Sequence, residues 1–171
     1  LPSDISCLSV QPAPDDFDPR RWTRGKHYRY RLLLRQSRCC FRARWTWHVR
    51  APLDRVAMRA GGEFLVGAHD FSSFRASGCG AAHARRTLRG LQIRDAPDDE
   101  VHLDFYGNGF LRHQVRIMVG TLVEVGQGRR DAEEVREMLE ARHRATAGPT
   151  APARGLWLMS VDVGDTPRPQ D

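Results

Sequence analysis

The chain has 171 residues, of which 40% are hydrophobic and 28% are charged, and its 27 Lys and Arg residues outnumber its 21 Asp and Glu residues to give a formal net charge of +6. This composition excludes collagen, a disordered acidic tail and a bundle of membrane helices. The length suffices for one sizeable hydrophobic core, or for one complete lobe with part of another. Because the first residue is Leu1 and not Met, we expect a processed chain or a piece of a longer protein.

The first third of the chain is predicted to form strands. Ile5–Val10 is a candidate strand, and Tyr alternates with Arg in the segment KHYRYRLLL (Lys26–Leu34). The segment RWTWHV (Arg44–Val49) alternates in the same way, with the period of a half-exposed strand. A hairpin through the region of Ser37 would join these two strands and place aromatic and arginine side chains on opposite faces.

The middle of the chain is predicted to form one helix and two strands. Apolar residues recur at helical spacing in Leu53–Phe64, and Asp54 lies in its first turn, where a carboxylate favours the helix dipole. Arg86–Ile93 and Val101–Tyr106 have the pattern of strands, with a turn at Ala96–Asp99 between them.

The last third is predicted to contain two helices and a final strand. Phe110–Val125 has a continuous apolar face and ends at Gly126, and Asp131–Ala141 has acidic residues in its first turn. Leu156–Val163 has the composition of a strand. Since the strands and helices follow no regular βαβ order, we predict an α+β fold in which helices pack on one face of a mostly antiparallel mixed sheet.

The positive charge is concentrated in one part of the sequence. Residues 19–53 contain no Asp or Glu, and aromatic residues are interleaved with their basic residues. Basic side chains neutralise phosphates and aromatic faces stack on bases, so the stretch indicates a nucleic-acid surface. A preference of the genome for Arg over Lys is an alternative explanation for the arginines, but not for the missing acids. The basic residues of this stretch are Arg20, Arg21, Arg24, Lys26, Arg29, Arg31, Arg35, Arg38, Arg42, Arg44 and Arg50.

The four cysteines do not predict a metal site or a disulfide framework. None of Cys7, Cys39, Cys40 and Cys79 forms a C-x-x-C pair, and no His stands at ligand spacing around them. No apolar run approaches the ~20 residues of a membrane-spanning helix. We therefore expect no metal, no membrane association and a location in a reducing cytoplasm.

Three positions are candidates for chemistry, each with a plainer alternative. His69 and Asp70 could act together as a general base for Ser72 or Ser73, but a role of Asp70 and the serines as turn or cap residues before a short helix explains them better. Arg116 stands beside the apolar face of a predicted helix, where it either reaches solvent along an edge or points into a cleft to bind a carboxylate or phosphate. Of Tyr28 and Tyr30, one is expected to face the core and the other the solvent or a ligand.

Four segments, in this order, resemble the TruA-type tRNA pseudouridine synthases. They are KHYRYR (26–31), GAHDFSSFRASGC (67–79), NGFLRHQVRIMVGTLVEVG (108–126) and ATAGPTAPARGLWL (145–158). Each segment alone would be a weak signal, whereas four in the same order at plausible spacing are specific. The match extends from about Leu1 to Val163.

The resemblance implies a particular activity. Enzymes of this family isomerise uridine to pseudouridine in the anticodon stem-loop of tRNA, at tRNA positions 38–40. They use no cofactor and no metal, and they are homodimers in which two pseudo-symmetric lobes share a sheet and enclose the active cleft. The expected partners of this chain are therefore tRNA and, in the full-length protein, a second copy.

The resemblance also assigns residues. By position, Tyr28 matches the tyrosine that stacks on the base, Arg116 matches the helical arginine that pairs with the catalytic aspartate, and Leu156 matches an apolar contact near the base. Trp157, Gln114 and Ile117 depart mildly from the family pattern. For RNA binding, we expect contributions from Arg20, Arg21, Arg24, Lys26, Arg29 and Arg31.

One element of the family pattern is missing. The catalytic aspartate of the family lies in an R-T-D-x-G-V-H motif of the first lobe, and this chain contains no such motif. We therefore expect a fragment that is inactive alone, with residues 1–50 as the end of the first lobe and the interlobe strands, residues 51–163 as the C-terminal lobe and residues 164–171 as a flexible tail. The alternative is a non-catalytic, basic RNA-binding module.

Overall fold

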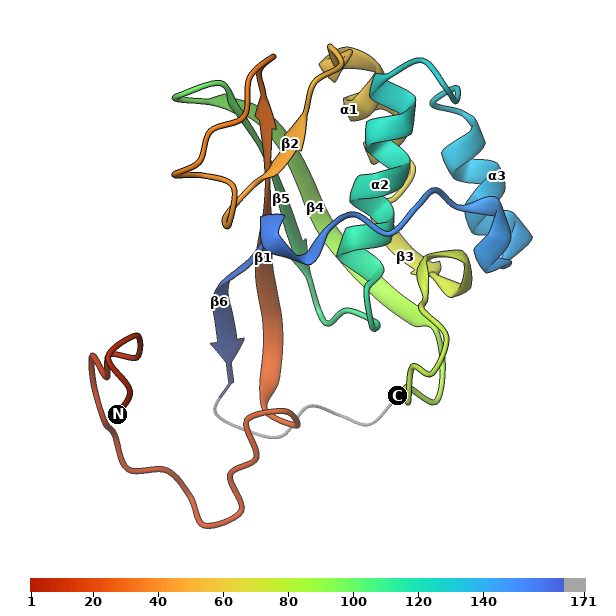
Figure 1. The fold of residues 1–171 in the computed structure, drawn as a ribbon. Coiled ribbons are helices and arrows are strands. Elements are labelled where there is room, and N and C mark those ends of the chain that lie inside the picture. The colour runs from red at the N-terminus through yellow and green to blue at the C-terminus, as the bar shows by residue number, and fades with distance from the viewer. Residues whose placement is uncertain (165–171) are drawn as a thin grey trace.

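The computed structural model describes residues 1–164 and shows one mixed sheet with helices on one side (Figure 1). Residues 165–171 lie outside the described residues, and so does nearly all of the predicted tail. The predicted α+β fold, with helices on one face of a mostly antiparallel mixed sheet, is confirmed. The strands are β1 (Thr23–Leu34), β2 (Trp47–Val49), β3 (Gly67–Asp70), β4 (Arg85–Ala96), β5 (Glu100–Gly107) and β6 (Leu156–Val163), and the helices are α1 (Arg55–Glu63), α2 (Gln114–Gly126) and α3 (Glu134–Ala141).

Strand β1 has partners on both sides, β5 on one and β2 with β6 on the other. The strand order is β2-β1-β5-β4-β3, and β6 also pairs with β1. The first part of β1 pairs with β6 and its last three residues pair with β2, so the two short partners share one edge. Because β1 and β2 belong to the same sheet as β4, β5 and β6, the predicted domain boundary at residue 50 separates strands that are hydrogen-bonded to one another; the boundary itself stays a prediction.

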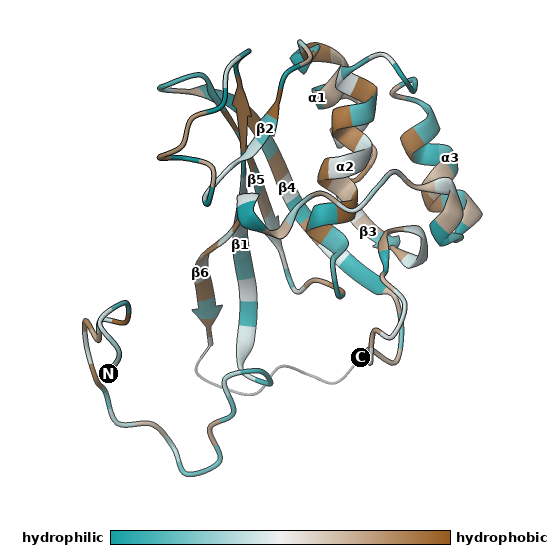
Figure 2. Cartoon of the chain, viewed as in Figure 1, coloured by the Kyte–Doolittle hydropathy of each residue, from teal (hydrophilic) through white to brown (hydrophobic). Residues whose placement is uncertain are grey.

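The alternation of β1 decides which side chains reach the core. Tyr30 and Leu32 are fully buried in the cluster between the sheet and the helices, whereas Arg29 and Arg31 project from the helix-free face. Figure 2 shows hydrophobic residues on the helices and on the upper part of β1, and hydrophilic residues along its lower part. The period-two pattern in the sequence therefore matches the burial of β1 from Arg29 to Leu32, and Leu33 departs from it because it is buried as well.

Local sequence explains where the helices begin. The side chain of Asp54 accepts hydrogen bonds from the backbone N–H groups of Val56 and Ala57 and so caps α1. Asp54 was expected in the first turn of the helix, but it lies just before that turn. Helix α2 begins at Gln114 and not at Phe110, because His113 has a left-handed backbone (φ 62°) and the Gln114 side chain accepts a hydrogen bond from the backbone N–H of Leu111. The predicted first turn of this helix is a loop in the structure.

Two predicted features near the N-terminus are wrong. Trp47–Val49 runs parallel to Leu32–Leu34, so these segments do not form a hairpin, and residues 35–46 are the connection that returns the chain. Ile5–Val10 is not a strand, since no described strand lies beside it to exchange hydrogen bonds. Its apolar side chains are exposed as a result, with Leu8 95% and Val10 87% exposed.

The segment between α3 and β6 crosses over α2 (Figure 1). Gly120 makes this crossing possible, because a Cβ at that position would lie 1.8 Å from the carbonyl oxygen of Pro149. One turn before Gly120 in α2, the carbonyl of Arg116 accepts a hydrogen bond from the backbone N–H of Ala151. This crossing fixes the surroundings of Arg116.

Candidate functional site

The two tyrosines of β1 lie on the same, helix-covered face but differ in burial. Tyr30 is fully buried, and its hydroxyl donates to the carbonyl of Pro152 at 2.6 Å. Tyr28 is half-buried, and its ring meets the edge of Phe110 with centroids 5.2 Å apart. Burial raises the pKa of both hydroxyls, so both are neutral phenols at neutral pH. The expectation that one of the two tyrosines faces the core is met by Tyr30. Tyr28 does not face the opposite side, because it also packs against the edge of the core, and its contact with a ligand stays a prediction.

Arg116 occupies the first turn of α2, beside the segment that crosses the helix. Its Nε donates to the carbonyl of Ala151 at 2.6 Å, which fixes one edge of the half-buried guanidinium group. Within residues 1–164, no carboxylate forms an ion pair with it. The rest of the guanidinium group is therefore available to an anion from outside the described residues.

Tyr30 lies near two of the predicted site residues, Arg116 and Leu156. The charge of Arg116 acts on its phenol, and Leu156 lies opposite Tyr30 in the pairing of β1 with β6. Gly155 permits this approach, because a Cβ there would lie 2.6 Å from the Tyr30 ring. The structure thus gathers Arg116 and Leu156 around Tyr30, with Tyr28 two residues further along the same face of β1.

A basic groove lies next to Tyr28. This cavity of about 670 Å³, here called the β1–β4 groove, has Arg20 and Lys26 on one side, and Phe110 contributes both to the groove and to the contact with Tyr28. None of the described residues that line it is acidic. The groove is lined by Arg20, Thr23, Lys26, Ala81, His83, Arg85, Arg86, Asn108, Gly109 and Phe110.

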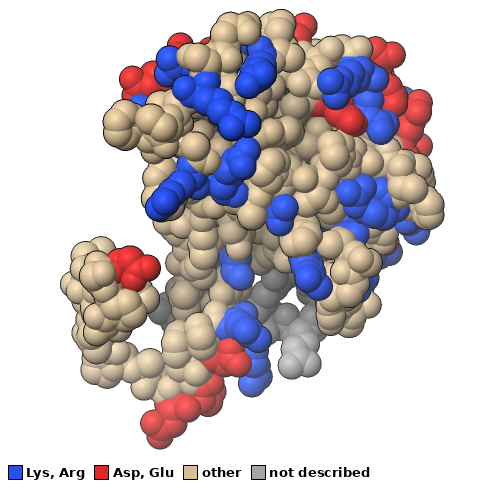
Figure 3. Space-filling view, in the orientation of Figure 1, with Lys and Arg blue, Asp and Glu red and all other residues tan. Residues whose placement is uncertain are grey.

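The six residues expected to bind RNA do not share one surface. Arg20 and Lys26 line the β1–β4 groove. Arg21 is exposed but is not among the lining residues. The carbonyl of Arg24 accepts a hydrogen bond from Arg89. Figure 3 shows Lys and Arg side chains spread across the face in view, with acidic side chains mostly at its margins.

Arg29 and Arg31 project from the opposite face, where buried carboxylates neutralise them. Arg29 Nε lies 2.8 Å from Asp104 Oδ1, and Arg31 Nη2 lies 2.7 Å from Glu100 Oε1. Both carboxylate side chains are almost completely buried, being 1% exposed for Asp104 and 2% for Glu100. A role for these two arginines in RNA binding stays a prediction, and the geometry favours a structural role.

Each of these carboxylates has two arginine neighbours and one histidine neighbour. Asp104 also contacts His27 at 2.6 Å and Arg94 at 3.3 Å. Glu100 also contacts Arg42 and His102. Burial opposes the ionisation of Glu100, but the hydrogen bonds from Arg31 and His102 outweigh burial and lower its pKa to about 2.

Sequence reasoning missed the β4 side of the groove. Arg85, Arg86 and Phe110 lie outside the acid-free stretch of residues 19–53 and were not expected to bind RNA. The signal was an adjacent arginine pair at the start of a predicted strand. The alternative interpretation of Asp70 is confirmed, because its Oδ1 accepts hydrogen bonds from the backbone N–H and the hydroxyl of Ser72.

Residues 1–164 contain neither a candidate metal-ion site nor a candidate membrane-spanning helix. They contain no group of three or more His, Cys, Asp or Glu residues placed to hold a metal ion. Among the described helices, none has the length and apolar character needed to cross a bilayer.

Comparison with known proteins gives a family. Residues 63–162 match the family model described as tRNA pseudouridine synthase. The tRNA pseudouridine synthase A of Myxococcus xanthus is 48% identical over 167 residues, which are 98% of this chain and 63% of the relative. The protein of the same name from Syntrophotalea carbinolica is 48% identical over 161 residues, covering 94% of this chain and 64% of the relative.

A third relative gives the same picture. The tRNA pseudouridine synthase A of Halalkalibacterium halodurans is 45% identical over 157 residues, covering 91% of this chain and 59% of the relative. The chain thus spans less than two thirds of the length of these three relatives. The match of more than half of the chain to the family model, together with these identities, shows that the chain belongs to the tRNA pseudouridine synthase family.

Proposed function

We propose that this chain is part of an enzyme that isomerises uridine to pseudouridine in tRNA, in the anticodon stem-loop at tRNA positions 38–40. The observation that carries the proposal is the contact of Tyr28 with Phe110 of a basic groove whose described lining contains no acidic residue, together with an Arg116 guanidinium that pairs with no carboxylate of residues 1–164. A groove of this charge suits the phosphate backbone, and an aromatic pair at its end suits a base taken out of its stack.

The reaction is a rearrangement within one nucleotide. The N1–C1′ glycosidic bond breaks, the base turns, and C5 forms a new bond to C1′. N1 gains a proton, and the proton from C5 passes to solvent. In this proposal Tyr28 stacks on the flipped-out base, Leu156 contacts it, and Arg116 holds a catalytic carboxylate in its ionised form.

Neither Asp70 nor the buried Asp104 fits the catalytic role. Asp104 lies on the helix-free face in contact with Arg29, Arg94 and His27, and Asp70 is held by Ser72 at the other edge of the sheet. We therefore propose that the catalytic aspartate lies in the part of the relatives that this chain does not match. The 171-residue chain would then bind RNA without turnover.

A tritium-release assay tests this proposal. Pseudouridine formation at a uridine labelled with tritium at C5 releases the label to water. A gene that also carries the coding sequence upstream of Leu1 should yield an active enzyme, whereas the 171-residue chain should release no tritium above background. Robust turnover by the 171-residue chain would contradict the assignment of the nucleophile.

The second candidate is a non-catalytic RNA-binding module, which the β1–β4 groove alone would support, since none of its described lining residues is acidic. Arg116→Ala separates the two candidates when it is made in the longer protein. For an enzyme, activity should fall by about a hundredfold or more, with tRNA affinity changed less than about threefold. If activity and tRNA affinity fall together, Arg116 binds RNA and does not hold a catalytic group.

The remaining parts of the proposal concern the whole protein. We propose that it is a cytoplasmic homodimer that acts on tRNA without a metal or cofactor. Analytical ultracentrifugation of the longer protein tests the dimer, and activity after dialysis against a chelator tests independence from metal.

A further inference from the structure

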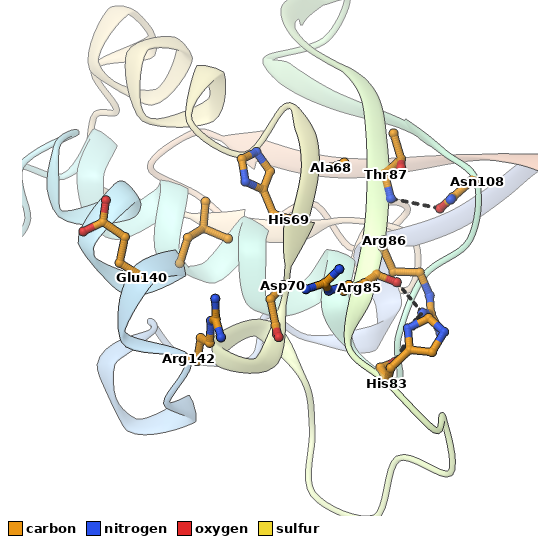
Figure 4. A pocket seen from close by; sticks show the side chains of 11 residues that line it. Ala68, His69, Asp70, His83, Arg85, Arg86, Thr87, Asn108, Glu140 and Arg142 are labelled. Carbon is orange, nitrogen blue, oxygen red and sulfur yellow. Dashed lines mark hydrogen bonds between the residues drawn. The ribbon is translucent and has the colours of Figure 1, made fainter. Parts of the chain in front are cut away.

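A second cavity, to which no function has been assigned, shares Arg85 and Arg86 with the β1–β4 groove. This cavity of about 730 Å³, here called the β3–α3 pocket, is formed by β3, the start of β4 and the end of α3 (Figure 4). It is lined by Ala68, His69, Asp70, His83, Arg85, Arg86, Thr87, Asn108, Leu139, Glu140 and Arg142.

Two guanidinium groups lie on either side of one carboxylate in this pocket. Figure 4 shows Asp70 between Arg85 and Arg142. The pKa of Asp70 is lowered mainly by its hydrogen bonds from Ser72, and also by the charges of Arg142 and Arg85. No hydrogen bond or ion pair joins either guanidinium group to a described residue, so their N–H groups are available.

The carboxylate of Asp70 has one oxygen in use and one available. Oδ1 accepts both hydrogen bonds from Ser72, at 2.9 Å from the backbone N–H and at 2.6 Å from the hydroxyl. Oδ2 accepts no hydrogen bond from a described residue. A ligand here therefore meets cationic donors and an acceptor side by side.

The two arginines and the free oxygen of Asp70 favour a ligand that carries both a phosphate and a hydroxyl group. A small polyanion would be repelled by Asp70 and by Glu140 at the rim, whereas a single phosphodiester next to a hydroxyl group uses both the donors and the acceptor. In RNA, each phosphodiester is adjacent to a 2′-hydroxyl, which donates a hydrogen bond that DNA cannot offer.

The pocket is continuous with the β1–β4 groove. His83, Arg85, Arg86 and Asn108 line both cavities. A strand of RNA that follows the groove past Lys26 therefore meets Arg85 next and the β3–α3 pocket beyond it.

From these observations we infer that the β3–α3 pocket binds one ribose-phosphate unit of the RNA that occupies the β1–β4 groove. Arg85 and Arg142 bind the phosphate, and Asp70 Oδ2 accepts the hydrogen bond of the 2′-hydroxyl. The inference rests on the proposed function, because it extends the RNA site by one subsite and adds a means of telling RNA from DNA.

The phosphate half is tested with the full 171-residue chain and a fluorescent anticodon stem-loop RNA, by anisotropy at several salt concentrations. Arg142→Gln should raise the Kd about tenfold and lower the slope of log K against log salt by about one. Arg129→Gln is the matched control, since Arg129 is an exposed arginine in the connection between α2 and α3, at the opposite end of α3. It should leave both quantities within about a factor of two.

The hydroxyl half is tested by comparing the same RNA with DNA of the same sequence. Asp70→Asn should reduce the preference for RNA over DNA, because it removes the anionic acceptor and lessens the repulsion of phosphate. Far-ultraviolet circular dichroism of each variant confirms that it is folded. An unchanged preference for RNA would overturn the role of Asp70.

The outcomes separate this inference from the proposed function. If the unmodified chain binds RNA and Arg142→Gln behaves like Arg129→Gln, the pocket is not part of the RNA site and the inference fails alone. If the unmodified chain does not bind RNA at all, the inference and the RNA-binding part of the proposed function both fail.

Discussion

The two faces of the sheet use similar side chains for opposite purposes. On the helix-free face, Asp104 and Glu100 are buried and each contacts two arginines and one histidine, so the positive charge of the arginines is compensated within the protein. On the other face, Arg20 and Lys26 line a groove that contains no acidic side chain among the described residues. A basic residue in the sequence therefore indicates a ligand only where no carboxylate of the fold lies within reach of its side chain.

Strand β1 supplies both faces, because its side chains alternate. The Tyr28 ring contacts Phe110, which lines the groove, whereas its neighbours His27 and Arg29 both contact Asp104 Oδ1, at 2.6 and 2.8 Å. The ion pairs of the helix-free face therefore fix the backbone on both sides of the tyrosine. Those ion pairs thereby help to hold Tyr28 in place on the helix-covered face.

The largest effect is expected from Asp104→Asn. This change leaves His27, Arg29 and Arg94 without their shared anion, and breaking a buried ion pair costs about 3 to 5 kcal/mol. Because these partners are partly exposed, we expect a loss of about 3 kcal/mol in the free energy of unfolding, measured by urea denaturation. Asp162→Asn is the control, since Asp162 is exposed on β6. A loss below ~1 kcal/mol for Asp104→Asn would show that the cluster is not structural.

The next effect is a dependence of stability on pH that Glu100 should cause. Its pKa is lowered from 4.5 to about 2 in the folded protein, so its contribution is fully present above the unfolded pKa and is lost as the pH falls from about 5 to 2. We expect the unmodified chain to lose about 3 kcal/mol more than Glu100→Gln over this range. Urea denaturation at pH 5, 4, 3 and 2 measures the difference, and parallel profiles would contradict the assignment.

A smaller effect distinguishes the two tyrosines. Tyr30→Phe leaves the carbonyl of Pro152 without its hydrogen-bond donor in the core, at a cost of about 1 kcal/mol. Tyr28→Phe removes a hydroxyl that donates to no described residue, so the free energy of unfolding should change by less than ~0.5 kcal/mol. Thermal unfolding of both variants tests the difference. Equal losses would mean that Tyr28 is also a core residue.

Much of the fold was predictable, because local patterns determine it. The alternation in Lys26–Leu34 predicted β1 and its buried face, and Asp54 predicted the start of α1. The direction of β2 was not predictable, since the choice of a parallel partner depends on long-range packing. The start of α2 was also missed, because the left-handed backbone of His113 is not a property that its residue type predicts.

The candidate site was predictable in part. The resemblance named Tyr28, Arg116 and Leu156. The pattern raised Tyr30 as a possible core residue, but neither the pattern nor the resemblance indicated that Tyr30 lies next to Leu156 and within the influence of the Arg116 charge. The pairing of Arg29 with Asp104 could not be foreseen, because the two residues are 75 positions apart in the sequence. Charge in a sequence window therefore overestimates the charge that the folded surface offers.

The most direct test compares one arginine from each face. Arg20→Gln and Arg94→Gln remove the same charge, from the β1–β4 groove and from the helix-free face, where the Arg94 side chain is 47% exposed. Binding of the anticodon stem-loop RNA is measured by anisotropy at a range of salt concentrations. If the groove is the RNA site, Arg20→Gln weakens binding and lowers the salt slope by about one, whereas Arg94→Gln changes neither. Equal effects of the two variants, or a larger effect of Arg94→Gln, would contradict the distinction between the two faces.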